Sequence, residues 1–197
     1  SVPEDIRAWQ DGDELKRVHW KLSMRRQSLM VHTYETPQRP DALVLLDCGA
    51  PKCAPAVRAA LVDVLAEACA GTLKSLLEAG RATHLPLSPS GQGEFSGHDA
   101  QALPAMLRAV AAAGYSETTD FSRVLWLASR RMQRTGSTAI LTTRLTPAVA
   151  DAAIALSRMG SKMRFTLVTA GDPSEEEAQL LHLLFASGLE TAHIRAA

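Results

Sequence analysis

Short apolar runs alternate with longer amphipathic segments through most of the chain. The first run, residues 42–46, closes on Asp47, which is typical of a strand buried on both faces of a parallel sheet. The next segment begins at Pro55 and stops at Gly80, with apolar positions at helical spacing in between. Because strands and helices then alternate, we predict an α/β domain over residues 41–197, with three layers and a doubly wound, mostly parallel sheet.

The same alternation continues to the end of the chain. In the first helix the apolar positions expected on one face are Val57, Leu61, Val64, Leu65, Ala68, Thr72 and Leu76. The further strands expected are 82–87, a short one around 94–95, 138–142, 163–169 and 191–194. Four further helices are expected: one that follows Asp99 and runs to about Gly114, one from the cap Asp120 to Gly136, one from Pro147 to Gly160, and one that begins at Pro173.

Residues 1–40 show a different pattern and are expected to form a helix-plus-strand extension packed on the domain. Asp13 follows a turn signal and is predicted to cap a helix. The apolar side of that helix would hold Leu15, Val18, His19 and Leu22. Residues 28–34 alternate in the manner of a strand.

The predicted N-terminal helix is the most basic stretch of the chain. One interpretation is a solvated face whose cations complement the helix end. The other is a contact surface for an acidic partner, a lipid headgroup or a phosphate. The candidate partner-binding residues are Arg17, Lys21, Arg25 and Arg26.

Composition narrows the classes of function. The formal net charge is zero and the basic residues form no known nucleic-acid motif, so nucleic acid is not expected as a partner. Three cysteines are an odd number, which argues against a disulfide framework and for a reducing compartment. No P-loop, nucleophile elbow or zinc-ligand spacing is present, and no cofactor is expected. The chain begins with serine and polar residues, so we expect it to be part of a longer protein.

One motif in the N-terminal stretch is specific: RAWQDGDELKRVHWKLS at residues 7–23, followed by LMV at 29–31. It resembles the signature of the "domain of unknown function 58" family. That resemblance implies a C-terminal part similar to von Willebrand factor type A domains. It also implies a bacterial, membrane-associated parent protein whose soluble part faces the cytoplasm, and a MoxR-type AAA+ ATPase as partner.

The type A resemblance also implies a metal-ion-dependent adhesion site where the strand order reverses. Members that bind a metal use an Asp-x-Ser-x-Ser motif, a threonine and a second aspartate. Here the first motif reads DCGAP from Asp47, so the aspartate remains and both serines are lost. Because Mg²⁺ requires several oxygen ligands, the crevice is expected to be degenerate and metal-free, with Asp47 bonding backbone amides instead. The crevice residues are Asp47, Gly49, Thr119, Asp120, Thr142 and Thr143.

Three functions stay open at this point. The preferred one is a non-enzymatic protein-interaction or adaptor module, and the alternative is a divalent-metal-dependent ligand-binding domain. An enzyme would need Asp47, His19 or Cys48 to converge in space. His19 is instead expected to be a hydrogen-bonded packing residue, and no cation adjoins Cys48 in the sequence to activate its thiol. An ion-pair network of Arg7, Arg17 and Asp13 is expected to hold the N-terminal segment to the sheet.

Overall fold

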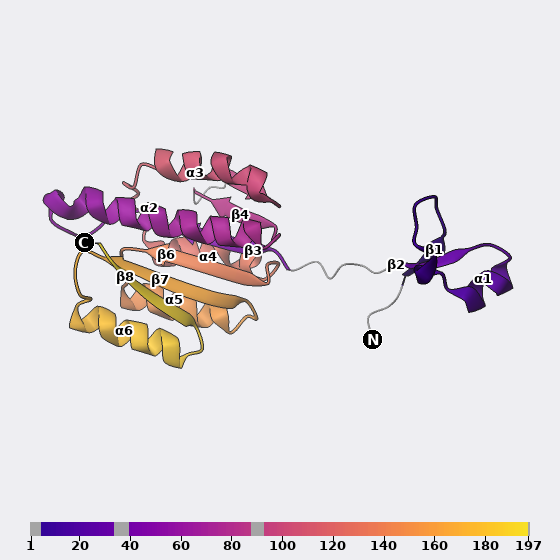
Figure 1. The fold of residues 1–197 in the computed structure, drawn as a ribbon. Helices are drawn as coiled ribbons and strands as arrows, with labels where there is room; N and C mark the ends of the chain where they lie inside the picture. Colours follow the sequence, from indigo (N-terminus) through magenta and orange to yellow (C-terminus); the bar gives the residue numbers. More distant parts are fainter. Residues whose placement is uncertain (1–4, 34–39, 88–92, 197) are drawn as a thin grey trace. The chain divides into compact units, whose positions relative to one another are not determined.

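A six-stranded sheet lies at the centre of the larger of two compact units, residues 39–197, and the smaller unit comprises residues 1–38 (Figure 1). The structure is a computed structural model that describes residues 5–33, 40–87 and 93–196. In the order in which they pair, the strands of the sheet are β5 (Glu94–Gly97), β4 (Thr83–Pro86), β3 (Ala42–Leu46), β6 (Ser137–Thr142), β7 (Lys162–Thr169) and β8 (Glu190–Arg195).

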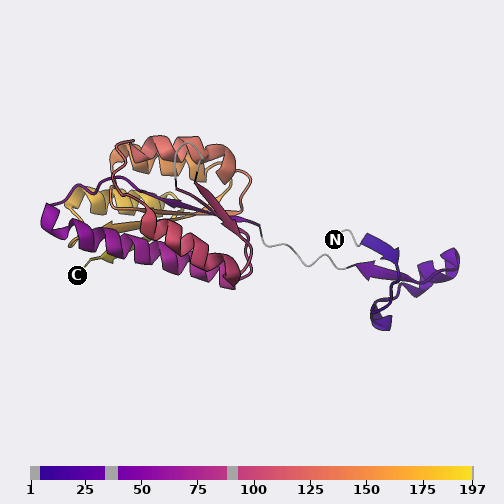
Figure 2. The same ribbon diagram turned by 90° about the horizontal axis from the view of Figure 1, so that it is seen from above.

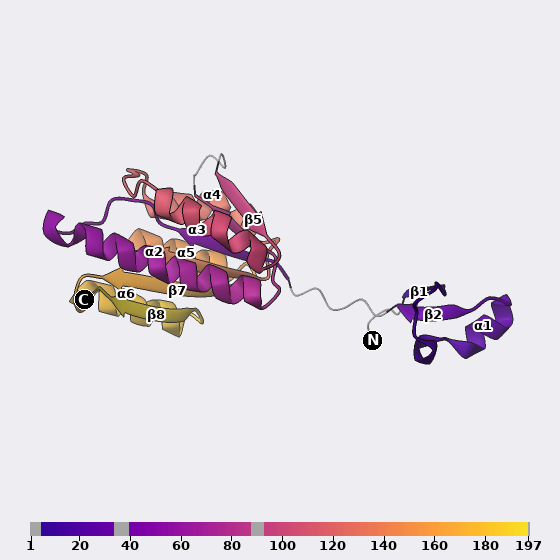
Figure 3. The same cartoon turned by 45° about the horizontal axis from the view of Figure 1, so that its top comes forward.

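All neighbouring strands of this sheet are parallel except β4 and β5, which pair antiparallel. Strands β5 and β8 form its two edges (Figure 3). From β3 the chain first adds β4 and β5 on one side and then β6, β7 and β8 on the other. The mostly parallel sheet predicted from the sequence is therefore confirmed, and its strand order reverses between β3 and β6.

Helices cover both faces of the sheet (Figure 2). Helices α2 and α3 pack on one face, and α4, α5 and α6 pack on the other. The helices of this unit are α2 (Pro55–Glu78), the 3-10 helix η2 (Ala100–Ala102), α3 (Leu103–Ala112), α4 (Phe121–Met132), α5 (Pro147–Ser157) and α6 (Glu175–Ala186). No helix in the described part of the chain is both long enough and apolar enough to cross a membrane.

Strand β3 explains how the two layers are held together. All five of its residues are buried. Leu43 and Leu45 join the core beneath α4, α5 and α6, whereas Val44 and Leu46 join the core beneath α2 and α3. Successive side chains of a strand point to opposite faces, so an uninterrupted apolar run is what a central strand between two helical layers requires.

The buried face of α2 differs from the expected one. Val57 is 39% exposed, and Thr72 and Leu76 are only partly buried. The side chains fully buried on this helix recur every four residues: Leu61, Leu65, Cys69, Leu73 and Leu77. From residue 68 onward the buried face therefore lies one residue after the expected one.

The N-terminal unit has a simpler architecture. Strand β1 (Asp5–Ala8) pairs antiparallel with β2 (Met30–Thr33), which confirms the strand predicted at 28–34 with shorter bounds. The 3-10 helix η1 (Leu15–Arg17) and the helix α1 (Trp20–Arg26) lie between them.

The prediction of a helix capped by Asp13 is wrong. The carboxylate of Asp13 accepts hydrogen bonds from both terminal nitrogens of Arg7, each at 2.7 Å, and from the backbone N–H of Gln10 at 2.9 Å. Helix α1 begins later, at the cap His19, because Val18 is extended and forms a bridge with Val31 of β2. The ion pair expected between Arg7 and Asp13 is thus present, while the side chain of Arg17 lies outside the described structure.

Candidate functional site

The crevice of this fold lies at the carboxyl ends of β3 and β6, where the strand order reverses. Open α/β sheets bind their ligands at such a point. Asp47 follows β3 directly, and Thr142 ends β6. The loop before α4 reaches the same place, since Glu117 N–H donates to Cys48 C=O at 3.1 Å and Gly49 forms a bridge with Glu117. The predicted convergence of these three segments is therefore present.

Asp47 is the centre of the crevice, and both of its carboxylate oxygens are fully engaged. The residue is only 2% exposed. Arg144 binds it in a bidentate manner, with Nε donating to Oδ2 at 2.9 Å and Nη2 donating to Oδ1 at 2.6 Å. Thr142 Oγ1 also donates to Oδ2, at 2.6 Å, and the Gly49 N–H donates to Oδ1 at 2.9 Å. The expected backbone contact is present, but the principal partner is an arginine.

Arg144 is the functional residue that the sequence analysis missed. Its backbone N–H donates to Thr142 Oγ1 at 2.8 Å, which fixes the loop that leaves β6. Its Nη2 also lies 3.4 Å from the carbonyl oxygen of Thr119. The hydrogen bonds to Asp47 raise the pKa of Arg144 above its already high ordinary value. The available signal was an arginine directly after the Thr-Thr pair that closes a predicted strand.

Gly49 makes this arrangement possible. A Cβ atom added at position 49 would overlap the guanidinium group of Arg144. The loss of the first serine position of the metal-binding motif to glycine therefore has a physical counterpart, because the guanidinium lies where a side chain would stand. Two of the differences from the motif, the glycine at position 49 and the arginine at position 144, are therefore sterically linked, because the glycine leaves the space that the guanidinium fills.

The other predicted crevice residues have separate roles. The carboxylate of Asp120 caps α4 by accepting from the Ser122 N–H at 2.9 Å, and this hydrogen bond is the main reason that the pKa of Asp120 is lowered. Thr119 contributes only its carbonyl oxygen to the Arg144 contacts. Thr143 is buried, and its hydroxyl has no hydrogen-bond partner among the described residues.

These contacts decide how well a metal would fit. A hard divalent cation needs free oxygen ligands, whereas here both oxygens of Asp47 accept from a permanently charged guanidinium. Within residues 5–33, 40–87 and 93–196 no group of three or more His, Cys, Asp or Glu side chains is placed to hold a metal ion. The residues present do not fit the metal that the type A resemblance implies.

A cavity of about 180 Å³ opens beside the Asp47–Arg144 pair. Its apolar walls come mainly from β3, from α4 and from the segment after β4. The lining residues are Leu45, Leu46, Asp47, Cys48, Gly49, Pro86, Leu87, Glu117, Thr119, Phe121, Val124, Leu127, Ala128, Arg131 and Arg144.

Cys48 borders this cavity but is poorly suited to be a nucleophile. Burial, followed by the negative charges of Asp47 and Glu117, raises the pKa of its thiol to about 11. The thiolate is the reactive form of cysteine, and it is scarce at neutral pH when the pKa is this high. The expectation that this thiol is not activated therefore has a structural basis in burial and adjacent carboxylates.

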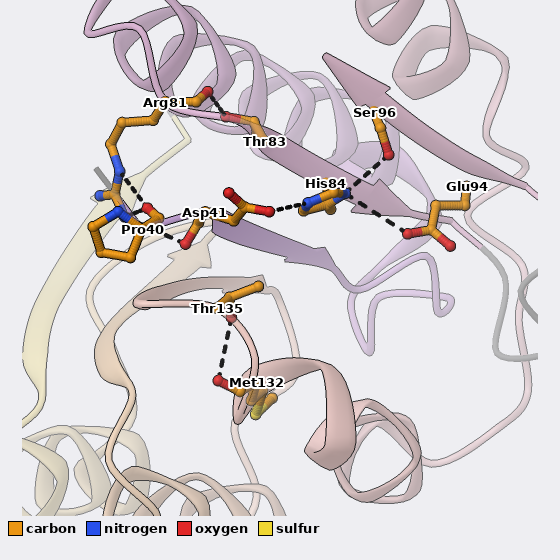
Figure 4. A network of polar contacts seen from close by, with 9 residues as sticks. All are labelled: Pro40, Asp41, Arg81, Thr83, His84, Glu94, Ser96, Met132 and Thr135. Carbon is orange, nitrogen blue, oxygen red and sulfur yellow. Dashed lines mark hydrogen bonds and ion pairs between the residues drawn. The ribbon is translucent and has the colours of Figure 1, made fainter. Parts of the chain in front are cut away.

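A second polar cluster crosses the surface of β3, β4 and β5 (Figure 4). His84 Nε2 lies 3.0 Å from Asp41 Oδ2, and its Nδ1 lies 2.9 Å from Ser96 Oγ. Glu94 also lies near this ring, at 3.9 Å, and pairs with Arg131 of α4 at 2.9 Å. The residue types are those of a hydrolytic triad, but neither His84 nor Ser96 lines the crevice cavity. The cluster ties three strands and α4 together.

The predicted partner-binding residues lie on α1 of the smaller unit. Lys21, Arg25 and Arg26 are exposed, and the two arginines occupy the last turn, where cations favour a helix end. Arg17 ends η1, and its side chain lies outside the described structure.

His19 has the packing role expected of it. Its Nδ1 accepts from the Leu22 N–H at 3.2 Å, and its ring stacks on His32 at a centroid distance of 4.6 Å.

The family model described as "Protein of unknown function DUF58" matches residues 5–194. No curated protein matches the chain. The match spans the N-terminal motif, the sheet and the crevice, so it covers both units of the structure. The chain therefore belongs to the DUF58 family.

Proposed function

We propose that this chain is a non-enzymatic protein-interaction module with a fold of the von Willebrand factor type A kind and a degenerate metal site. The single observation that carries the proposal is the bidentate contact between Arg144 and Asp47. The arginine supplies, from within the chain, the positive charge that a metal ion would supply. The crevice thus keeps its position at the reversal of strand order without a divalent cation.

The same geometry argues against an enzyme. Asp47 is buried and bonded through both oxygens, so it has no lone pair directed to a substrate proton. Cys48 remains a thiol at neutral pH because its pKa is raised to about 11. His19 belongs to the N-terminal unit and accepts a backbone hydrogen bond there. Of the three candidate catalytic groups, the Asp47 carboxylate and the His19 ring are therefore held in hydrogen bonds, and the Cys48 thiol is not ionised.

The proposed partner is a MoxR-type AAA+ ATPase at the cytoplasmic face of a bacterial membrane, as the family resemblance implies. The exposed cations Lys21, Arg25 and Arg26 provide a surface for an acidic region of that partner.

The test is capture of the cognate MoxR-type ATPase by the full-length parent protein. Charge reversal at Lys21→Glu, Arg25→Glu and Arg26→Glu together is expected to abolish capture. A matched variant reverses three exposed arginines of the larger unit, Arg58, Arg108 and Arg158, and is expected to retain it. Failure of the wild-type protein to capture the ATPase, with or without nucleotide, would contradict the proposal. Capture that disappears on chelation of divalent metal would support the metal-dependent alternative instead.

A further inference from the structure

Helix α4 presents an exposed face that combines cations with two large apolar side chains. Trp126 is 49% exposed and Leu127 is 58% exposed. Positions three, four and seven residues apart share one face of a helix, so these two side chains lie beside Arg123 and Arg130. The helix contains no acidic residue, and a further exposed cation, Arg134, follows its end. Tryptophan and arginine are the residue types most enriched at the energetic centres of protein interfaces.

The same helix forms one wall of the crevice cavity. Val124, Leu127 and Ala128 line the cavity from α4, opposite Leu45 of β3. The cavity has a volume of about 180 Å³. An engineered apolar cavity of about 150 Å³ is large enough to hold benzene. One bulky apolar side chain, such as phenylalanine or leucine, therefore fits within it.

Arg131 borders the cavity and is already engaged within the chain. This residue lines the cavity, and its Nη2 pairs with Glu94 at 2.9 Å. Its Nη1 is buried and has no hydrogen-bond partner among the described residues. Since that nitrogen is buried, a ligand at the surface does not reach it, and the cations that a partner's carboxylates can reach are the exposed Arg130 and Arg134.

We infer that this surface binds an acidic segment of a partner protein, with one bulky apolar side chain in the cavity and flanking carboxylates on Arg130 and Arg134. The inference rests on the proposed interaction function and specifies the chemistry of the partner. Nucleic acid also carries negative charge, but a cavity with several apolar lining residues beside the cationic face matches an aliphatic or aromatic side chain better than a phosphate backbone.

The experiment uses the full chain and a capped heptapeptide in which one phenylalanine is flanked on each side by three acidic residues. Isothermal titration calorimetry is expected to give saturable binding with a dissociation constant below about 1 mM. Replacing the phenylalanine of the peptide with alanine is expected to weaken binding at least about tenfold. The same loss is expected for the protein variant Arg130→Glu/Arg134→Glu and for Leu127→Ser. The matched control Arg58→Glu/Arg108→Glu reverses two exposed arginines of α2 and α3, on the opposite face of the sheet, and should bind as the wild type does.

Several outcomes would overturn the inference. These are no saturable binding of the heptapeptide, equal binding of the alanine peptide, undiminished binding by the α4 variants, or equally tight binding of an oligothymidine. Capture of the MoxR-type ATPase is measured with the same proteins. If capture holds while the peptide fails to bind, the inference about α4 is wrong and the proposed function stands. If the peptide binds while wild-type capture fails, the inference stands and the proposed partner is wrong.

Discussion

Arg144 and Asp47 are separated by 97 residues in the chain, yet they form a bidentate ion pair at the carboxyl ends of two adjacent parallel strands, with N–O distances of 2.9 and 2.6 Å. The side chains are 13% and 2% exposed, so the pair is shielded from water. Desolvating two charges is expensive, and the contact is tolerated because Thr142 and Gly49 complete the hydrogen bonds of the carboxylate. The pair therefore fixes the shape of the crevice.

Breaking this pair from one side is expected to be strongly destabilising. Arg144→Ala leaves the buried carboxylate of Asp47 without its countercharge, which should lower the free energy of unfolding by about 3–5 kcal/mol in urea titrations. Asp47→Ala should also destabilise, because it leaves the guanidinium partly buried and unpaired. The double variant should lose at least about 1 kcal/mol less than the sum of the single losses, since the two residues contact each other. Strict additivity of the two single changes would contradict the contact.

Adding a divalent metal ion tests whether the guanidinium of Arg144 keeps metal out of the crevice. Wild-type protein should show a change in melting temperature below about 1 °C with millimolar Mg²⁺ or Mn²⁺, since a ligand stabilises only when it binds the folded state. Arg144→Ser removes the guanidinium and returns a hydroxyl next to Asp47 and Thr142, so this variant should gain a metal-dependent rise in melting temperature. Samples of both proteins that have been treated with a chelator and receive no added metal serve as the reference. A clear rise in the wild type would show that the guanidinium does not exclude metal.

Gly49 offers a test that leaves both charges in place. Gly49→Ala should destabilise the protein by about 1–3 kcal/mol, because the added methyl group overlaps the guanidinium and displaces it from Asp47. Gly71→Ala is the matched control, since it lies within α2 and an added Cβ meets no atom within 4 Å. That change should stabilise by about 0.5–1 kcal/mol through helix propensity. The two variants should therefore move the urea midpoint in opposite directions, and a shared direction would argue against the steric account.

The sheet could be predicted from sequence because its signals are local. A continuous apolar run at 42–46 and helix-start residues such as Pro55 and Asp120 depend on near neighbours only. The N-terminal unit was harder. Asp13 has the residue type of a helix cap, but an arginine six positions earlier binds its carboxylate and Val18 pairs with β2. Long-range pairing overrode local propensity there.

In the crevice, too, some features could be predicted from the sequence and others depend on contacts between distant residues. Its backbone position followed from strand order, and Asp47, Thr142 and the loop before α4 meet there as expected. Arg144 could not be predicted from the metal-binding motif of type A domains, because that motif consists of residues with oxygen ligands and contains no arginine. Its partner lies on another strand, so no spacing in the chain connects them. The cavity beside α4 could not be predicted from the sequence either, because the residues that line it come from segments far apart in the chain.

The reactivity of the cysteines tests how closed the crevice is. Cys48 and Cys69 are buried, whereas Cys53 is partly exposed. Burial is the leading cause that raises the pKa of Cys48 to about 11 and that of Cys69 to about 12, from an ordinary value of 9.0. A thiol reagent at pH 8 should therefore label Cys53 rapidly and the other two only after unfolding, as peptide mapping by mass spectrometry would reveal.

The same raised pKa values set a pH window for stability. Below about pH 9 the thiols are protonated in both states, so their contribution to stability is fully present. Between pH 9 and 11 the unfolded chain releases the protons first, and the folded state loses stability relative to it. Because other groups also titrate there, the comparison is the difference in unfolding free energy between wild type and Cys48→Ala/Cys69→Ala. That difference should decline as the pH rises from 9 to 11, since the variant lacks both thiols. A constant difference over this range, or labelling of Cys48 as fast as Cys53, would mean that water reaches the base of the crevice.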